Sequence, residues 1–166
     1  GVPDSVLKHF LSAIPKKKNF ISNNEGSAVA YGIGHYLSSK KIPLIYMQNS
    51  GLGNAINPLI SIAHKKVYSI PMILIVGWRG EPGVKDEPQH AKQGQIMIDL
   101  LKALRIKYRI VSPQDDNEDE IAKTLSLIID EIINHVDGPI IGACERAEVF
   151  LSKWKSELPF GRPMAP

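Results

Sequence analysis

Residues 70–90 read Ile-Pro-Met-Ile-Leu-Ile-Val-Gly-Trp-Arg-Gly-Glu-Pro-Gly-Val-Lys-Asp-Glu-Pro-Gln-His, an apolar run that passes directly into a charged segment. The apolar part, residues 70–77, is typical of a buried strand. The glycines and prolines that follow favour a shaped loop over a helix. In open α/β sheets, ligands bind at the carboxyl ends of strands. A loop there with Arg79, Lys85 and His90 predicts a site for a small polyanionic substrate, although a solvated surface loop would also be polar.

Shorter apolar runs alternate with amphipathic stretches on either side of this strand. The segment 118–136 is the clearest helix, because Ile121, Leu125 and Ile128 recur at helical spacing. This alternation predicts an α/β domain with a mostly parallel sheet and helices on both faces. The predicted strands are 19–22, 44–47, 71–76, 108–111 and 139–143, and the predicted helices are 26–38, 52–63, 89–104 and 118–136.

Composition limits the class of protein. With 166 residues, 43% of them hydrophobic, and a formal charge of +3, we expect one ordinary soluble domain. The basic clusters at 16–18 and 40–41 are not interleaved with aromatic residues, so nucleic-acid binding is not expected. The single cysteine, Cys144, excludes an intramolecular disulfide and a multi-cysteine metal site. No apolar run has the length of a membrane span and no signal peptide is visible, which favours the cytoplasm.

Both ends of the chain are unusual for a domain. Residues 1–5 resemble a turn that follows a strand, so we expect a first element to be missing. Residues 158–166 are rich in proline and are typical of a linker. The prediction is a domain over 1–157 and a linker over 158–166 that leads to a further domain.

Three loops that follow predicted strands should share one edge of the sheet. In the first, Asn24 can cap a helix and Glu25 would sit in its first turn, where a carboxylate is favourable without any function. In the second, Gly51 and Gly53 would let the backbone approach a flat or anionic ligand. This second loop matches neither a Walker loop nor a dinucleotide motif. The third is the charged loop after residue 77.

The residues of these loops carry a resemblance to a known family. The runs Asn24-Glu25-Gly26, Tyr46-Met-Gln-Asn-Ser-Gly-Leu-Gly-Asn54 and 77–90 resemble phosphonopyruvate decarboxylases and, more broadly, the pyrimidine-binding domain of thiamine-diphosphate enzymes. The resemblance covers residues 1–104 and, more loosely, extends to residue 144. It implies that 1–157 is a pyrimidine-binding domain. It also implies thiamine-diphosphate-dependent decarboxylation of 3-phosphonopyruvate to phosphonoacetaldehyde and CO₂.

The resemblance assigns roles to single residues. Glu25 matches the glutamate that hydrogen-bonds N1′ of the cofactor's aminopyrimidine, a position from which it directs general acid–base catalysis. Asp4 and His90 match positions that line the reacting centre, where they would shuttle protons; a turn-forming aspartate and a helix-start residue are the plain alternatives. The turn beside the pyrimidine ring matches Asn49, Ser50, Gly51, Leu52, Gly53 and Asn54.

Two cations of the charged loop are candidates for binding the phosphonate. Arg79 offers a guanidinium suited to bidentate contact, and Lys85 adds a point charge. A salt bridge from Lys85 to Asp86 or Glu87 across the loop is the alternative.

The chain lacks the Gly-Asp-Gly motif with which these enzymes hold the diphosphate and Mg²⁺. The resemblance therefore implies no metal site in this chain and a partner, either a diphosphate-binding domain or a subunit, that holds Mg²⁺. The resemblance also implies a homo- or hetero-oligomer that acts on a small 2-oxo acid. The first alternative is the α subunit of sulfopyruvate decarboxylase. An alternative of another class is a non-catalytic module that binds an anion or a nucleotide.

Overall fold

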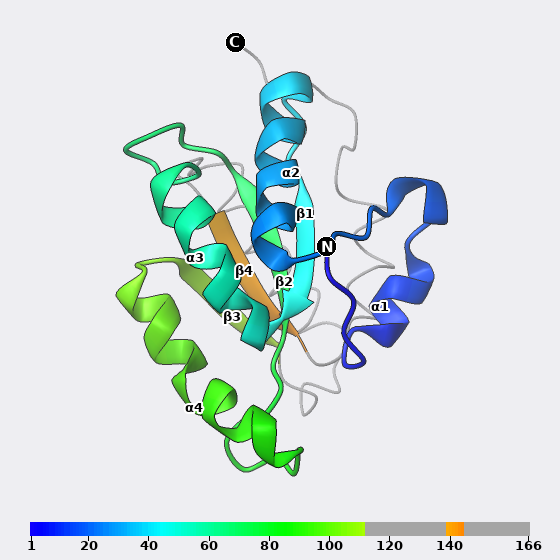
Figure 1. Cartoon of the computed structure of the whole chain (residues 1–166), viewed down its shortest axis with the longest axis vertical. Helices are drawn as coiled ribbons and strands as arrows, with labels where there is room; N and C mark the ends of the chain where they lie inside the picture. The colour runs from blue at the N-terminus through cyan, green and yellow to red at the C-terminus, as the bar shows by residue number, and fades with distance from the viewer. Residues whose placement is uncertain (112–138, 145–166) are drawn as a thin grey trace.

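A four-stranded sheet forms the centre of the computed structural model, which describes residues 1–111 and 139–144 (Figure 1). The strand order is β1-β2-β4-β3, and every pairing is parallel. β2 is buried along its whole length, as its continuous apolar sequence predicts. The strands are β1 (Leu44–Gln48), β2 (Met72–Gly77), β3 (Lys107–Val111) and β4 (Pro139–Cys144).

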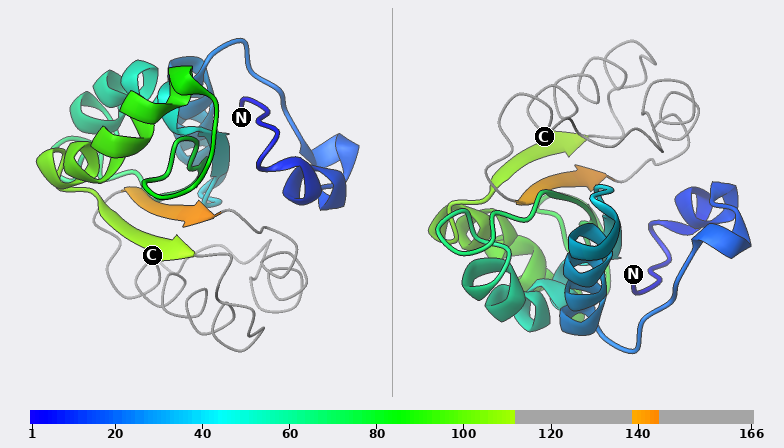
Figure 2. Two further views of the ribbon diagram at one scale, coloured as in Figure 1. Left: turned by 90° about the horizontal axis from the view of Figure 1, so that it is seen from below. Right: turned by 90° about the horizontal axis from the view of Figure 1, so that it is seen from above.

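The three longest described helices cover one face of this sheet (Figure 2). Met47 of β1 and Leu74 of β2 point to that face and pack in one apolar cluster with Val29, Leu59 and Met97 of the helices. The helical elements are α1 (Lys8–Ala13), the 3₁₀ turn η1 (Lys16–Lys18), α2 (Glu25–Ser39), the 3₁₀ turn η2 (Asn49–Gly51), α3 (Leu52–Ser61) and α4 (Pro88–Ala103).

The opposite face of the sheet is contacted by α1. Tyr46 follows the strand alternation and points away from Met47. Its ring meets that of Phe10 edge-on, with centroids 6.1 Å apart, and Phe10 is completely buried. The sheet is therefore parallel with helices on both faces, so the predicted α/β class is confirmed.

Local sequence signals set where the main helices begin. The Asn24 side chain accepts a hydrogen bond from Ser27 N at 2.8 Å and caps α2, as predicted. Pro88 occupies the first turn of α4, where its missing N–H has no cost. Both starts lie at the carboxyl edge of the sheet, which brings α2 and α4 to the expected position of the site.

Most predicted elements agree with the structure to within two or three residues. One prediction is wrong: residues 19–22 form no strand but an extended segment, held by hydrogen bonds such as Ser22 N to Gly1 O at 2.9 Å. The short helix α1 was not predicted. The predicted helix 118–136 and the linker 158–166 lie outside the described residues. Within the described ranges, no helix is long and apolar enough to cross a membrane.

Candidate active site

Glu25 is held at the start of α2 by the turn after β1. Its Oε2 accepts a hydrogen bond from Asn54 Nδ2 at 2.8 Å, and the side chain is half-buried. Gly51 packs against the carboxyl group so closely that any Cβ at residue 51 would overlap it. Gly51 is thus needed for close approach, and the interaction joins α2 to α3. Two of the loops that the sequence placed at one edge do meet there.

Asn49 joins the loop after β1 to the loop after β2. This buried amide donates from Nδ2 to Arg79 O at 2.8 Å and accepts at Oδ1 from Arg79 N at 3.3 Å. The two bonds satisfy both ends of the amide, so its orientation is fixed. Asn49 therefore positions the backbone from which the Arg79 side chain projects.

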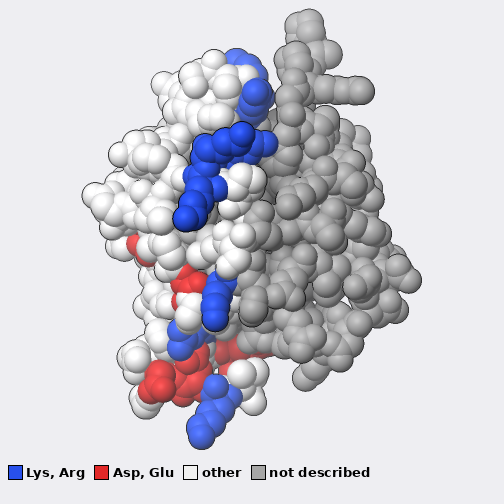
Figure 3. All heavy atoms as spheres, turned by 90° about the vertical axis from the view of Figure 1, so that its right-hand side faces the viewer, with Lys and Arg blue, Asp and Glu red and all other residues white. Residues whose placement is uncertain are grey.

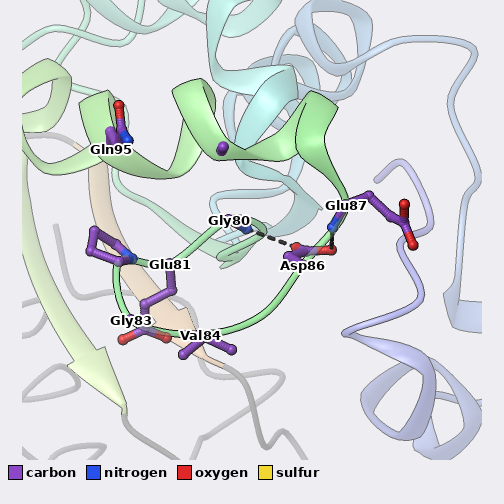
Figure 4. Close-up of a pocket in the computed structure, with 9 residues that line it drawn as sticks. Gly80, Glu81, Gly83, Val84, Asp86, Glu87 and Gln95 are labelled. Carbon is purple, nitrogen blue, oxygen red and sulfur yellow. Dashed lines mark hydrogen bonds between the residues drawn. The ribbon is translucent and has the colours of Figure 1, made fainter.

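Arg79 is engaged within its own loop. Its Nε and Nη2 bind the two oxygens of Asp86 at 2.8 and 2.6 Å in a bidentate pair. Asp86 also accepts from Gly80 N and Glu87 N, each at 2.8 Å (Figure 4). The hydrogen bond from Arg79 holds the pKa of Asp86 well below its usual range, and the same bond raises the pKa of Arg79. The remaining nitrogen, Nη1, lies 3.1 Å from Ser5 Oγ.

Asp4 is buried beside this arginine. Its side chain is only 3% exposed, and Oδ1 lies 3.8 Å from Arg79 Nη1. Oδ1 also accepts from Ser5 N at 2.8 Å and from Gln48 Nε2 at 3.0 Å. Oδ2 has no hydrogen-bond partner in the part of the chain that the structure describes. A turn also begins here, with Leu7 N bonded to Asp4 O at 3.1 Å. The structure thus brings Asp4, Arg79 and the end of β1 together.

Lys85 and His90 differ from the other candidates. Lys85 is exposed, and no hydrogen bond or ion pair of its side chain occurs among the described residues. The alternative, a salt bridge from Lys85 to Asp86, is not seen among the described residues, because Asp86 forms its ion pair with Arg79. His90 is half-buried in the first turn of α4, and its side chain likewise makes no hydrogen bond within the described part of the chain. Their roles stay predictions.

A hollow of about 190 Å³ lies inside the loop after β2 (Figure 4). Its lining includes Glu81, Asp86 and Glu87, and the Glu87 side chain points away from the loop. Figure 3 shows one face of the molecule, on which acidic side chains gather in the lower half with basic side chains beside them, and further basic side chains lie in the upper half. The Glu81 carboxylate and the lack of any Lys or Arg among the lining residues make this hollow unsuitable for a phosphonate. Neither Glu25 nor Asp4 lines it, so we place the site at the sheet edge instead.

The residues at the sheet edge fit the pyrimidine half of thiamine diphosphate. Glu25 keeps Oε1 without a hydrogen bond from any described residue, so one oxygen of the carboxyl group is available to a ring nitrogen. Gly51 lets the Glu25 side chain pack directly on the backbone of the turn. The described ranges contain no group of three His, Cys, Asp or Glu side chains that could hold a metal ion.

Gln48 and Asp86 are contact residues that the sequence analysis did not select. Gln48 reaches Asp4 across 44 positions of chain, so no local pattern indicates the contact. Asp86 lies seven positions after Arg79, and the loop that folds between them contains two glycines with positive φ, Gly80 and Gly83. The Pro-Gly pairing of this loop was a usable signal for such a turn.

Comparisons with known proteins identify the family and the fold. The family model described as "Thiamine pyrophosphate enzyme, N-terminal TPP binding domain" matches residues 1–103. In structure, the chain is similar to benzoylformate decarboxylase from Polynucleobacter necessarius, with a TM-score of 0.61 and 21% identity, over 100% of this chain and 29% of that one. At this identity the structural similarity shows the fold alone.

Two kinds of curated relative are similar in sequence. Phosphonopyruvate decarboxylase of Streptomyces viridochromogenes is 37% identical over 119 residues, which are 70% of this chain and 29% of the relative. Sulfopyruvate decarboxylase subunit alpha of Methanocaldococcus jannaschii is 34% identical over 120 residues, which are 69% of this chain and 68% of the relative. The chain therefore spans under a third of the first relative's length and about two thirds of the second's.

Proposed function

Because this chain belongs to the thiamine pyrophosphate enzyme family, we propose that it supplies the pyrimidine-binding half of a 2-oxo acid decarboxylase whose substrate is 3-phosphonopyruvate. The observation that carries the proposal is the Glu25 carboxyl group, fixed by Asn54 and packed on Gly51 with one oxygen available. The products would be phosphonoacetaldehyde and CO₂. The other half of the site, with Mg²⁺ and the diphosphate, would belong to a second domain or subunit.

Each candidate residue of the site has a proposed task in this reaction. When bound, thiamine diphosphate supplies a carbon nucleophile and an electron sink for the loss of CO₂. Glu25 would hydrogen-bond N1′ of the pyrimidine through its carboxyl group, and residues Asn49–Gly51 with Leu52, Gly53 and Asn54 would form the turn beside the ring. Loss of CO₂ from the substrate carboxylate requires one proton at the former keto carbon. Asp4 and His90 are the groups proposed to deliver it.

Binding of the phosphonate is assigned to Lys85 and Arg79. Lys85 has the mobility and exposure to meet a substrate that arrives from solvent. Arg79 contributes only through Nη1, since its other two nitrogens bind Asp86.

We expect Lys85→Ala to raise KM for phosphonopyruvate about 10-fold, which corresponds to the free energy of one charged hydrogen bond, with kcat little changed. Lys92→Ala, which removes an exposed lysine of α4, is the matched control. An unchanged KM in the Lys85 variant would remove this residue from the proposal.

Glu25→Gln tests the central assignment. The amide keeps the shape but loses the charge, so decarboxylation by the complete enzyme should fall by about 100-fold or more. Glu81→Gln makes the same chemical change in the loop after β2 and should leave the rate unchanged. Circular dichroism should show both variants folded. A Glu25 variant with activity within a few-fold of the parent would contradict the assignment.

A second candidate substrate is sulfopyruvate. Its carbon skeleton is the same, and it carries a tetrahedral anion at the same position, so the same lysine and arginine would bind it. The observation in its favour is that the chain is 34% identical to a sulfopyruvate decarboxylase subunit alpha, close to its 37% identity to a phosphonopyruvate decarboxylase. The partner would then be a separate subunit, and the enzyme a hetero-oligomer.

A further inference from the structure

The two oxygens of the Asp4 carboxyl group have very different surroundings. Oδ1 faces three donors: Ser5 N at 2.8 Å, Gln48 Nε2 at 3.0 Å and Arg79 Nη1 at 3.8 Å. Oδ2 is buried and has no hydrogen-bond partner among the described residues. A buried oxygen without a partner costs free energy, so its place in a fold calls for an explanation. The hydrogen bonds that orient this carboxyl group are therefore all made through Oδ1.

Gln48 is the side chain that holds Asp4 in this orientation from the sheet. It is the last residue of β1, and its backbone is in register with Gly77 of β2. Ser50 Oγ donates to Gln48 Oε1 at 2.6 Å. With the amide oxygen satisfied in this way, the amide nitrogen faces Asp4. A flipped amide would set an oxygen against the carboxylate, so Asp4 selects the nitrogen end of Gln48, and Ser50 donates to the oxygen end.

Gly77 provides the space that Oδ2 occupies. A Cβ at residue 77 would lie 2.5 Å from Asp4 Oδ2, which is closer than real Cβ atoms approach an oxygen. The ends of β1 and β2 thus act on the two oxygens separately. Gln48 binds Oδ1, and the bare backbone at Gly77 leaves room for Oδ2.

We propose that Gln48 is a positioning residue, which holds Asp4 by Oδ1 in the orientation from which the carboxyl group delivers its proton at the reacting centre. The inference rests on the proposed function, in which Asp4 delivers a proton to the former keto carbon. Gln48 acts only through Asp4. Its removal should therefore affect the chemical step and leave substrate binding intact.

The kinetic test uses the complete enzyme with Gln48→Ala. We expect kcat for 2-oxo acid decarboxylation to fall about 10- to 100-fold, the usual effect of a displaced catalytic group, with KM within about two-fold. Gln95→Ala truncates an exposed glutamine of α4 and should keep the parent rate. In an Asp4→Ala background, the Gln48 substitution should change kcat by less than about two-fold, because the two residues act as one unit. A further 10-fold loss in that background would overturn the proposal.

Gln48→Glu gives a test by pH. The introduced carboxyl group would face Asp4 Oδ1, and the charged groups around the pair among the described residues are Arg79 and its partner Asp86. Two adjacent carboxylates resist ionising together, so a proton shared at low pH restores the donor to Asp4. The loss of rate relative to the parent should therefore be smaller at pH 5.5 than at pH 8. A loss independent of pH would contradict a role through Asp4.

A readout without turnover separates this inference from the proposed function. In a crystal structure of the complete Gln48→Ala enzyme, the Asp4 carboxyl group should rotate away from the orientation seen here. An unmoved Asp4 would overturn the inference. If the parent enzyme decarboxylates neither acid, the proposed function fails, and the crystal structure still decides whether Gln48 positions Asp4.

Discussion

At the scale of the residue, the close contact between Gly51 and Glu25 sets the position of the carboxyl group. Any side chain at residue 51 would overlap the Glu25 carboxyl group, which is itself held by Asn54. Gly51→Ala should therefore displace Glu25 and reduce kcat nearly as far as Glu25→Gln. The measurement is steady-state decarboxylation, with thermal unfolding to confirm that the variant is folded.

Gly34→Ala is the matched control for that substitution. Gly34 lies on the same helix as Glu25, and a Cβ there meets no atom within 4 Å. Its replacement should leave activity unchanged and stabilise the protein by about 0.5–1 kcal/mol. If both alanine variants were fully active, Gly51 would not set the position of Glu25.

A second prediction at this scale concerns pH. The Arg79 hydrogen bond depresses the pKa of Asp86, so the folded state binds that proton less readily than the unfolded state. The pair therefore stabilises the protein above the unfolded carboxyl pKa of about 3.9, and this stabilisation is lost as the pH falls further, toward the folded value. Asp86→Asn should lower the melting temperature by a constant amount from pH 7 to about pH 5 and by a shrinking amount below pH 4. A difference that grows on acidification would contradict this.

The ion pair between Arg79 and Asp86 also shows why the role of Arg79 was hard to predict from the sequence. The loop contains two cations and several acids within nine positions, and sequence does not tell which cation binds Asp86. The structure gives the bidentate contact to Arg79, whose guanidinium matches both carboxylate oxygens, and leaves Lys85 exposed. Two glycines with positive φ shape the loop so that the Asp86 side chain lies next to that of Arg79.

At the scale of the element, β1, β2, α2, α3 and α4 were all predictable. The reason is that the two strands are short, continuous apolar runs, whereas the apolar residues of the helices recur at helical spacing. The extended segment 19–22 looked like a strand, but Phe20 and Ile21 are 60% and 63% exposed and join no sheet. Helix α1 has only six residues and no capping side chain. Its formation therefore depends on tertiary packing, which cannot be predicted from the local sequence.

The packing of α1 can be tested directly. Phe10 is completely buried against Tyr46, so Phe10→Ala should lower the free energy of unfolding by about 3–5 kcal/mol. Phe20→Ala makes the same truncation at a site that is 60% exposed and should cost less than about 1 kcal/mol. Urea unfolding of the two variants is the measurement. Equal losses would show that α1 contributes little to the fold.

At the scale of the whole molecule, the sheet edge gathers residues from four separate segments. Asp4 precedes α1, Glu25 starts α2, Asn49 follows β1 and Arg79 follows β2. Direct contacts link Glu25 to Asn54 of α3, Asn49 to Arg79, and Arg79 to Asp4. That these loops share an edge was predictable, because parallel strands place their carboxyl ends together. The detailed partners were not, since they depend on side-chain geometry between distant segments.

The measurement that tests the account most directly is aldehyde release from phosphonopyruvate and, in parallel, from sulfopyruvate. The chain would be combined with its diphosphate-binding half, thiamine diphosphate and Mg²⁺. The account predicts cofactor-dependent turnover of phosphonopyruvate that is faster than turnover of sulfopyruvate and is lost with Glu25→Gln. Preference for sulfopyruvate would keep the role of Glu25 and replace the substrate. No turnover of either acid, in a complex shown to have formed, would contradict the account and favour a non-catalytic binding module.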